Sequence, residues 1–200
     1  HSRRFFYPRV VPRADPPHAE RFDGTYATGD VRAMGGGAPV EIGYRLYRCA
    51  KSPIRGRAAR GLLLYFHGNG EVASDYDGIS ELYNLMGMHL MVVEFRGYGW
   101  STDEPPRLAS MLSDAEPLIE SGALDRALRA AGLDPHALPV IVFGRSMGSP
   151  VAIHLAAYAP ERFAGLVVES GMAGMRENED DGSVITGVAI GGVDLAGIGE

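Results

Sequence analysis

The stretch VIVFGRSMGSPVAIHLA, residues 140–156, decides the fold that this sequence predicts. It opens with a short apolar run, Val140–Phe143, which lacks alternation and is therefore typical of a strand buried on both faces. A Gly-x-Ser-x-Gly pentapeptide follows at once, and a helix is predicted for 146–158, ending before Pro160. A serine on a tight turn between a buried strand and a helix is the arrangement of a nucleophile elbow.

The pentapeptide makes Ser146 the candidate catalytic nucleophile. Gly144 and Gly148 are needed because the turn is tight and larger side chains would collide with neighbouring backbone. The predicted helix begins at the serine, so backbone N–H groups there point toward incoming negative charge. The bare pattern also occurs by chance, and the alternative is that Ser146 only caps the helix.

A second glycine-rich loop, HGNG at residues 67–70, follows an earlier buried strand predicted for Gly61–Phe66. In enzymes with a nucleophile elbow, the loop after that strand supplies one backbone N–H to the oxyanion hole. Asn69 is the best candidate donor by position, with Gly70 next, and Met147 supplies the other N–H. The alternative is an ordinary turn between a strand and a helix. The motif residues of the two loops are His67, Gly68, Gly70, Gly144 and Gly148.

Buried strands alternate with helical segments along most of the chain. This rhythm indicates an α/β fold: a mostly parallel sheet with helices on both faces and βαβ crossovers. The predicted strands are 61–66, 90–95, 140–143 and 163–169, and the predicted helices are 74–86, 108–131 and 146–158. Ligand sites in such sheets lie outside the carboxyl ends of the strands.

Several segments carry more specific expectations. Two earlier runs, 21–31 and 40–48, are predicted to form antiparallel strands near the N-terminus. The helix over 108–131 should break near Pro117 or Gly122. In the helix predicted over 74–86, the apolar residues have helical spacing and should lie along one face; they are Tyr76, Ile79, Leu82, Tyr83 and Met86.

The composition excludes several classes of protein. Of the 200 residues, 46% are apolar and 22% are charged. This apolar content is too high, for such a modest charge, for a disordered chain. The single cysteine, Cys49, excludes a disulfide framework and a cysteine-rich zinc site. No apolar run reaches the roughly 18 residues of a membrane span.

Positive charge is concentrated near the N-terminus. Residues 1–60 hold 12 Lys or Arg against 5 Asp or Glu, whereas the whole chain has a net charge of −6. Such a region can contact an anionic partner. No aromatic ladder or nucleic-acid-binding module accompanies it, so we expect solvated flanks of strands and loops, and no nucleic-acid partner. Membrane association stays open.

The chain resembles the serine-aminopeptidase-like hydrolases of the α/β-hydrolase superfamily. The similarity lies in LLLYFHGNGEVASDY (62–76), VVEFRGYGWS (92–101) and VIVFGRSMGSPVAIHLA (140–156), with a less specific match at FFYP (5–8). It covers about residues 40–170 and implies Ser146 as nucleophile with Asn69 and Met147 as oxyanion-hole residues. It also implies cleavage of an ester, thioester or amide in a small-molecule or acyl substrate through an acyl-enzyme, without metal or cofactor.

The chain departs from this family because no convincing base or acid is present. The family order places Asp or Glu and then His after the serine. Only His154 follows Ser146, and a helix rise of about 1.5 Å per residue puts it roughly 12 Å further along the axis. Glu169 is a candidate orienting acid, although a side chain at a strand end is more often structural. The remaining histidines and the other late acid, expected in structural or unsuitable places, are His1, His18, His67, His89, His136 and Asp194.

Two explanations compete. Either the acid and the histidine lie downstream, so that this chain is a C-terminally truncated hydrolase with little activity alone, or the chain is a non-catalytic binding module with a hydrolase fold. We favour the first. The chain then divides into an irregular basic N-terminal segment, 1–20, and a partial hydrolase domain, 21–200, in which 171–200 begins a cap or loop region. We expect loop or short helix over 172–200, and a cytoplasmic location unless an N-terminal targeting or anchor segment precedes His1.

Three residues near the predicted site allow two interpretations each. Arg145, beside the serine, is expected either to meet an acidic substrate group or, more simply, to form a structural ion pair. Tyr98 and Trp100 are expected either to line the mouth of a pocket or to pack their own loop.

Overall fold

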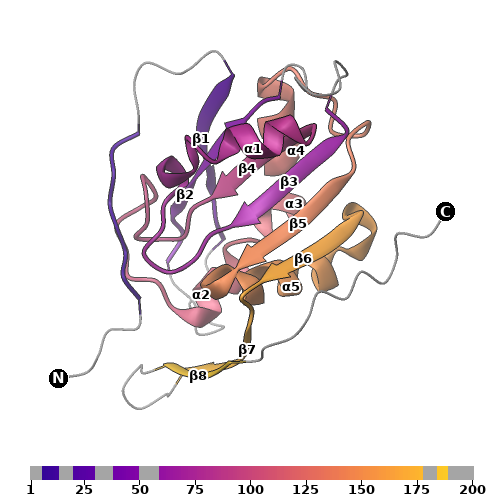
Figure 1. Cartoon of the computed structure of the whole chain (residues 1–200). Coiled ribbons are helices and arrows are strands. Elements are labelled where there is room, and N and C mark those ends of the chain that lie inside the picture. Colours follow the sequence, from indigo (N-terminus) through magenta and orange to yellow (C-terminus); the bar gives the residue numbers. More distant parts are fainter. Residues whose placement is uncertain (1–5, 14–19, 30–37, 50–58, 178–183, 189–200) are drawn as a thin grey trace.

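The computed structural model describes residues 6–13, 20–29, 38–49, 59–177 and 184–188. Its centre is a six-stranded sheet in the order β1-β2-β4-β3-β5-β6 (Figure 1). The pairs β3–β4, β3–β5 and β5–β6 are parallel, whereas β1–β2 and β2–β4 are antiparallel. The expected fold class, including the antiparallel N-terminal strands, is confirmed. The strands are β1 (Arg21–Ala27), β2 (Glu41–Tyr47), β3 (Gly61–Phe66), β4 (Met88–Val93), β5 (Val140–Arg145) and β6 (Gly165–Glu169).

The central strands bury both faces, as their unbroken apolar runs predict. In β3, Leu62, Leu64 and Phe66 join the larger core cluster, while Leu63 and Tyr65 join a smaller cluster on the other face. The larger cluster is completed by residues of the helices α2 to α5, and the smaller one by residues of the η2 turn. Successive side chains of a strand point to opposite faces, so one strand supplies both cores.

The helices cover the sheet in short pieces. The segment 108–131 breaks at both predicted places. Pro117 begins α3, where its missing N–H is tolerated, and Gly122 precedes α4 with a φ of +68°. The helical elements are η2 (Ala73–Tyr76), α1 (Ser80–Leu85), α2 (Leu108–Ser113), α3 (Pro117–Glu120), α4 (Ala123–Ala130), η3 (Ser146–Gly148), α5 (Ser149–Tyr158) and η4 (Pro160–Arg162).

The prediction of one continuous helix over 74–86 is wrong. The segment divides into η2 and α1, and its Leu82 side chain is 60% exposed. Asp77 lies in the interruption, where its carboxylate accepts hydrogen bonds from Arg45 at 2.9 Å and from the Tyr47 hydroxyl at 2.7 Å. These bonds to β2, together with the low helix propensity of Gly78, favour the break over a regular helix.

The loop or short helix expected over 172–200 is also wrong where the structure describes it. Met172–Glu177 (β7) and Val184–Val188 (β8) form an antiparallel pair with a register irregularity between Ala173 and Met175. Figure 1 shows this hairpin beyond the end of β6, outside the six-stranded sheet. Glycines at 174 and 187 lie inside these strands and weaken the strand pattern in the sequence. Residues 178–183 and 189–200 lie outside the described ranges.

The described part of the N-terminal segment runs alongside the loop after β4. Val11 donates its N–H to the Gly99 carbonyl at 2.9 Å, and Gly99 donates its own N–H to the Arg9 carbonyl at 2.8 Å. In the same loop, Trp100 Nε1 donates to the Gly24 carbonyl at 3.1 Å, so the indole packs the loop against β1. Of the helices in the described ranges, none is long and apolar enough to cross a bilayer.

The core predicts a large loss of stability on truncation of a central side chain. Leu64, in β3, is fully buried, so Leu64→Ala should lower the free energy of unfolding by about 2–5 kcal/mol, because it removes apolar contacts and leaves a cavity. Urea unfolding followed by circular dichroism measures this. Leu82→Ala is the control: that side chain is exposed, and the change should stay within about 0.5 kcal/mol. Equal losses in both variants would contradict the assigned core.

Candidate active site

The turn after β5 leaves no room for side chains at its two glycines. A Cβ at Gly144 would lie 2.6 Å from the Gly148 carbonyl oxygen and 2.7 Å from Cβ of Ala152. A Cβ at Gly148 would lie 2.1 Å from the carbonyl oxygen of Phe66, the last residue of β3. These separations are far below van der Waals contact, so the backbone can take this path only with glycine at both positions.

Ser146 occupies the strained position of this turn. Its φ of +48° lies in the left-handed region, which non-glycine residues seldom adopt and which costs about 1–3 kcal/mol. The residue follows β5 directly and begins η3. The residues preceding η3 and α5 are Arg145 and Gly148, and neither helix has a side-chain cap hydrogen bond. The alternative in which Ser146 serves only as a helix cap is therefore wrong.

The loop of residues 67–70 lies beside this turn because β3 and β5 are parallel neighbours. Phe66 pairs in register with Gly144, so the segments that follow the two strands leave the sheet at the same edge. Gly70 has a φ of +77°, which glycine adopts readily. The structure therefore brings this loop and Ser146 to the carboxyl edge, where ligand sites of parallel sheets lie.

Hydrogen bonds from distant parts of the chain hold Asn69. The Tyr98 hydroxyl donates to Asn69 Oδ1 at 2.8 Å, and the Tyr7 backbone N–H donates to the same oxygen at 2.9 Å. Burial raises the pKa of Tyr98, so the phenol stays protonated and remains a donor. Arg9 donates to the Gly70 carbonyl oxygen at 3.0 Å. Tyr98 is fully buried and thus packs its loop instead of lining a pocket mouth.

Arg145 connects the two loops through ion pairs. Its guanidinium pairs with Glu71, which follows the HGNG loop, and with Glu169 at the end of β6, at 3.5 Å. Glu71 also accepts the Gly68 backbone N–H at 2.8 Å. Of the two interpretations of Arg145, contact with an acidic substrate group or a structural ion pair, the structure supports the ion pair. Glu169, the candidate orienting acid, pairs with Arg145.

None of the histidines in the described ranges hydrogen-bonds Ser146. His154, on α5, lies 2.8 Å from a carboxylate oxygen of Glu116. His89 is buried within β4, and His136 lies in the loop before β5, at the opposite edge of the sheet. The expectation that these residues do not serve as the base agrees with their positions. His1, His18 and Asp194 lie outside the described residues.

Sequence reasoning missed the partner of His67. Both side chains are fully buried, and His67 Nε2 lies 3.0 Å from Oε2 of Glu94, the residue after β4. The other ring nitrogen, Nδ1, lies 2.8 Å from the Gly68 carbonyl oxygen. The available signal was a carboxylate at the end of a buried apolar strand, since an unpaired charge is rarely placed there.

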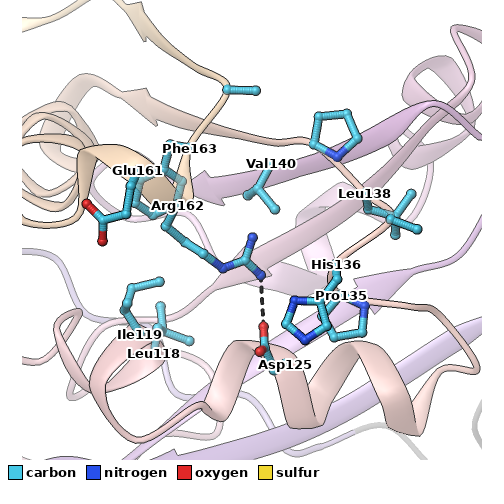
Figure 2. A pocket seen from close by; sticks show the side chains of 13 residues that line it. Leu118, Ile119, Asp125, Pro135, His136, Leu138, Val140, Glu161, Arg162 and Phe163 are labelled. Carbon is cyan, nitrogen blue, oxygen red and sulfur yellow. Dashed lines mark hydrogen bonds and ion pairs between the residues drawn. The ribbon is translucent and has the colours of Figure 1, made fainter.

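A hollow among the described residues lies away from Ser146. A cavity of about 590 Å³ opens at the amino ends of β5 and β6, lined by residues that include Pro139, Val140 and Ala164. In Figure 2, Arg162 faces Asp125 across this cavity, and the two form an ion pair at 2.8 Å. The elbow lies at the opposite edge of the sheet from this cavity. In the ranges that the structure covers, no three or more His, Cys, Asp or Glu are grouped to hold a metal ion.

The model of the family described as serine aminopeptidase, S33, matches residues 57–189. Among curated proteins, the chain is 25% identical over 185 residues to Protein bem46 of Schizosaccharomyces pombe, covering 88% of this chain and 56% of that protein. It is 27% identical over 163 residues to human monoglyceride lipase, covering 82% of this chain and 45% of the lipase. The chain thus spans about half the length of these relatives.

Solved structures share the fold. A probable hydrolytic enzyme from Pseudomonas aeruginosa superposes with a TM-score of 0.55 at 19% identity, over 82% of this chain and 46% of that one. A thermostable carboxyl esterase from Bacillus coagulans does so with a TM-score of 0.52 at 20% identity, over 74% and 43%. At these identities the similarity concerns the fold alone.

The close contact at Gly148 predicts a sharp effect from one added methyl group. Gly148→Ala should lower the free energy of unfolding by about 3 kcal/mol or more, because the methyl group meets the backbone oxygen of Phe66, which cannot rotate away. Gly78→Ala is the matched control, since nothing lies within 4 Å of its added Cβ, and its stability should change by less than about 1 kcal/mol. Chemical denaturation compares them. A Gly148→Ala protein as stable as the control would refute the turn geometry.

Burial of His89 predicts a pH dependence of stability. Burial, with a smaller contribution from Arg48, lowers the pKa of His89 to about 4, whereas an unfolded histidine titrates near 6.5. The unfolded state therefore binds the proton more readily. The stabilising contribution is complete above about pH 6.5 and is lost as the pH falls toward 4, up to about 3 kcal/mol.

The variant His89→Asn tests this effect. Its side-chain oxygen can still accept the Cys49 N–H that His89 Nδ1 accepts at 3.0 Å, but the variant has no group that titrates. Urea unfolding at several pH values should show a weaker acid dependence for His89→Asn than for the wild type. His136→Asn, at an exposed position, should keep the wild-type dependence. Identical pH profiles for all three proteins would rule out the proposed cause.

Proposed function

The chain belongs to the serine aminopeptidase S33 family of α/β-hydrolases, and we propose that it cleaves a carboxylic ester, thioester or amide through an acyl-enzyme on Ser146. The observation that carries the proposal is the backbone of Ser146. A φ of +48° on a turn enforced by two glycines is a strained conformation of the kind that clusters at active sites. Ser170 shares the left-handed backbone but lacks the flanking Gly-x-Ser-x-Gly turn.

Ser146, Asn69 and Met147 have the direct roles in this mechanism. The Ser146 hydroxyl attacks the acyl carbon, and the carbonyl oxygen becomes an oxyanion. The backbone N–H groups of Asn69 and Met147 donate to this oxyanion, and preorganised donors of this kind contribute strongly to catalysis. The Met147 donor belongs to the residue after the nucleophile, and the Asn69 donor to the loop after β3, as in other enzymes with a nucleophile elbow.

The proposal assigns the base and the acid to residues outside the described ranges. A histidine must lie within about 3 Å of the serine hydroxyl to take its proton, and no described histidine does so. We expect the acid and the histidine downstream of residue 200. The half-length coverage of the curated relatives supports this expectation. No step of the mechanism needs a metal or a cofactor.

Acyl esters are the favoured substrates within this proposal. Relatives named monoglyceride lipase and a putative esterase support an ester over an amide. The substrate is then a small molecule or acyl compound that enters at the carboxyl edge of the sheet.

A second candidate is a non-catalytic binding module of the same fold. The observation that favours it is the lack of a base among the described residues. A basic N-terminal region that contacts an anionic partner receives little support, because four of its six described arginines already bind acidic groups of the chain. Arg9 pairs with Asp75 at 2.6 Å, and Arg45 pairs with Asp23 at 2.7 Å.

A fluorophosphonate probe applied to the full-length protein separates the two candidates. The hydrolase proposal predicts covalent labelling that Ser146→Ala abolishes, because the probe reacts with an activated serine hydroxyl. Ser170→Ala is a matched control: Ser170 also has a left-handed backbone, with a φ of 49°, at the end of the neighbouring strand β6. Labelling should survive in that variant. A protein that resists the probe would favour the binding module, whereas a Ser146→Ala variant that still reacts would refute Ser146 as the nucleophile.

A further inference from the structure

The buried pair formed by His67 and Glu94 has no part in the mechanism above. Neither side chain is exposed to solvent, and the two groups meet at 3.0 Å. The His67 ring is enclosed by aromatic side chains, with its centroid 4.6 Å from that of Phe95 and 5.4 Å from that of Tyr98. Burying a carboxylate is costly unless it is paired and hydrogen-bonded, so the position calls for a specific explanation.

His67 controls the peptide group that carries the proposed oxyanion donor. Its Nδ1 lies 2.8 Å from the Gly68 carbonyl oxygen, and a carbonyl only accepts hydrogen bonds, so Nδ1 carries a hydrogen. That carbonyl and the N–H of Asn69 belong to one planar trans peptide, in which they point in opposite directions. Fixing the Gly68 oxygen therefore fixes the direction of the Asn69 N–H.

Glu94 holds the same loop at both of its ends. One carboxylate oxygen contacts His67, at the start of the loop, and the other accepts the Ala73 backbone N–H at 2.8 Å, just after it. Gly99 gives this carboxylate no room to move: a Cβ at Gly99 would lie 2.1 Å from Glu94 Oε1. Two hydrogen bonds to the Glu94 side chain therefore hold the residues on either side of the loop 68–72.

The protons of the pair are set by the same contacts. Which ring nitrogen of a histidine carries hydrogen is determined by the partner of the other nitrogen. Because Nδ1 donates to the Gly68 oxygen, a single hydrogen must lie between Nε2 and the Glu94 carboxylate. An apolar side chain at 94 would remove this contact and the acceptor of the Ala73 N–H, leaving the ring and the loop free to turn.

We propose that Glu94 is a positioning residue for hydrolysis: through His67 and Ala73 it orients the Gly68–Asn69 peptide so that its N–H faces the oxyanion. The inference rests on the proposed function, because it requires the Asn69 N–H to be an oxyanion donor. It assigns no contact between Glu94 and the substrate. It predicts that loss of Glu94 slows the chemical step without weakening substrate binding. Donors that act only in the transition state have this signature.

Two substitutions separate positioning from general stability. Glu94→Leu removes both hydrogen bonds. Glu94→Gln keeps both, because its amide oxygen can accept the Ala73 N–H and its amide nitrogen can donate to Nε2 of a neutral His67. Glu104→Leu, which removes a partly exposed carboxylate that pairs with Arg96 in the loop after β4, is the matched control. Thermal unfolding verifies that each variant is folded.

The first readout is the reaction of the full-length protein with the fluorophosphonate. In Glu94→Leu the maximal labelling rate should fall about 10- to 100-fold, within the loss seen when an oxyanion donor is removed, while the probe concentration for half-maximal rate stays unchanged. Glu94→Gln and Glu104→Leu should stay within about threefold of wild type. A labelled wild type with an equally fast Glu94→Leu variant would overturn the positioning role but leave the proposed function standing.

The second readout does not depend on labelling. In ¹⁵N-labelled protein, Glu94→Leu should shift the backbone amide resonance of Asn69, and Glu94→Gln should return it toward the wild-type position. The same measurement applies if the wild type resists the probe, an outcome that contradicts the proposed function. An Asn69 resonance that Glu94→Leu leaves unchanged would overturn the inference in either case.

Discussion

The contact between Gly148 and the carbonyl oxygen of Phe66 is the constraint on which the site depends. It allows the start of the helical segment after β5 to rest directly on the end of β3, with no side chain between them. Parallel pairing of β3 and β5 brings the two loops to one edge, and this contact sets how closely they approach. The left-handed backbone of Ser146 follows from the same tight path. The elbow, the loop of residues 67–70 and the strain at the serine are therefore one geometric arrangement.

Two buried arginines form ion pairs that hold separate segments of the chain together. The uneven distribution of charge along the sequence does not predict these pairs. Arg45, in the basic N-terminal part, is 1% exposed and binds both Asp23 on β1 and Asp77 between η2 and α1. Arg96 is equally buried and binds Asp114 at 2.7 Å. Removing one partner of such a pair would leave an uncompensated buried charge, which is strongly destabilising. Arg45 therefore joins the antiparallel N-terminal strands to the segment after β3, and Arg96 joins the loop after β4 to the end of α2.

The sequence predicts best what depends on neighbouring residues. The buried strands follow from apolar runs such as Gly61–Phe66, and the breaks in the segment 108–131 follow from Pro117 and Gly122. The helix over 74–86 fails because Asp77 bonds to β2, a contact that local spacing does not contain. The two loops of the site were predictable because their glycines lie where the local backbone path leaves no room for a side chain or has a positive φ. The pairing of Glu94 with His67 was not, because the two residues are 27 positions apart and meet only when β3 and β4 pair.

The N-terminal segment also bears on how the domain should be delimited. Tyr7 and Arg9 bond to Asn69 and Gly70, so the described start of the chain forms part of the support of the HGNG loop. A domain boundary drawn at residue 57, where the family similarity begins, would discard these two residues together with β1 and β2. The protein would keep Ser146 and the glycines of the elbow but lose part of the support of the HGNG loop. The structural unit that supports this loop is therefore longer than the segment by which the family is identified.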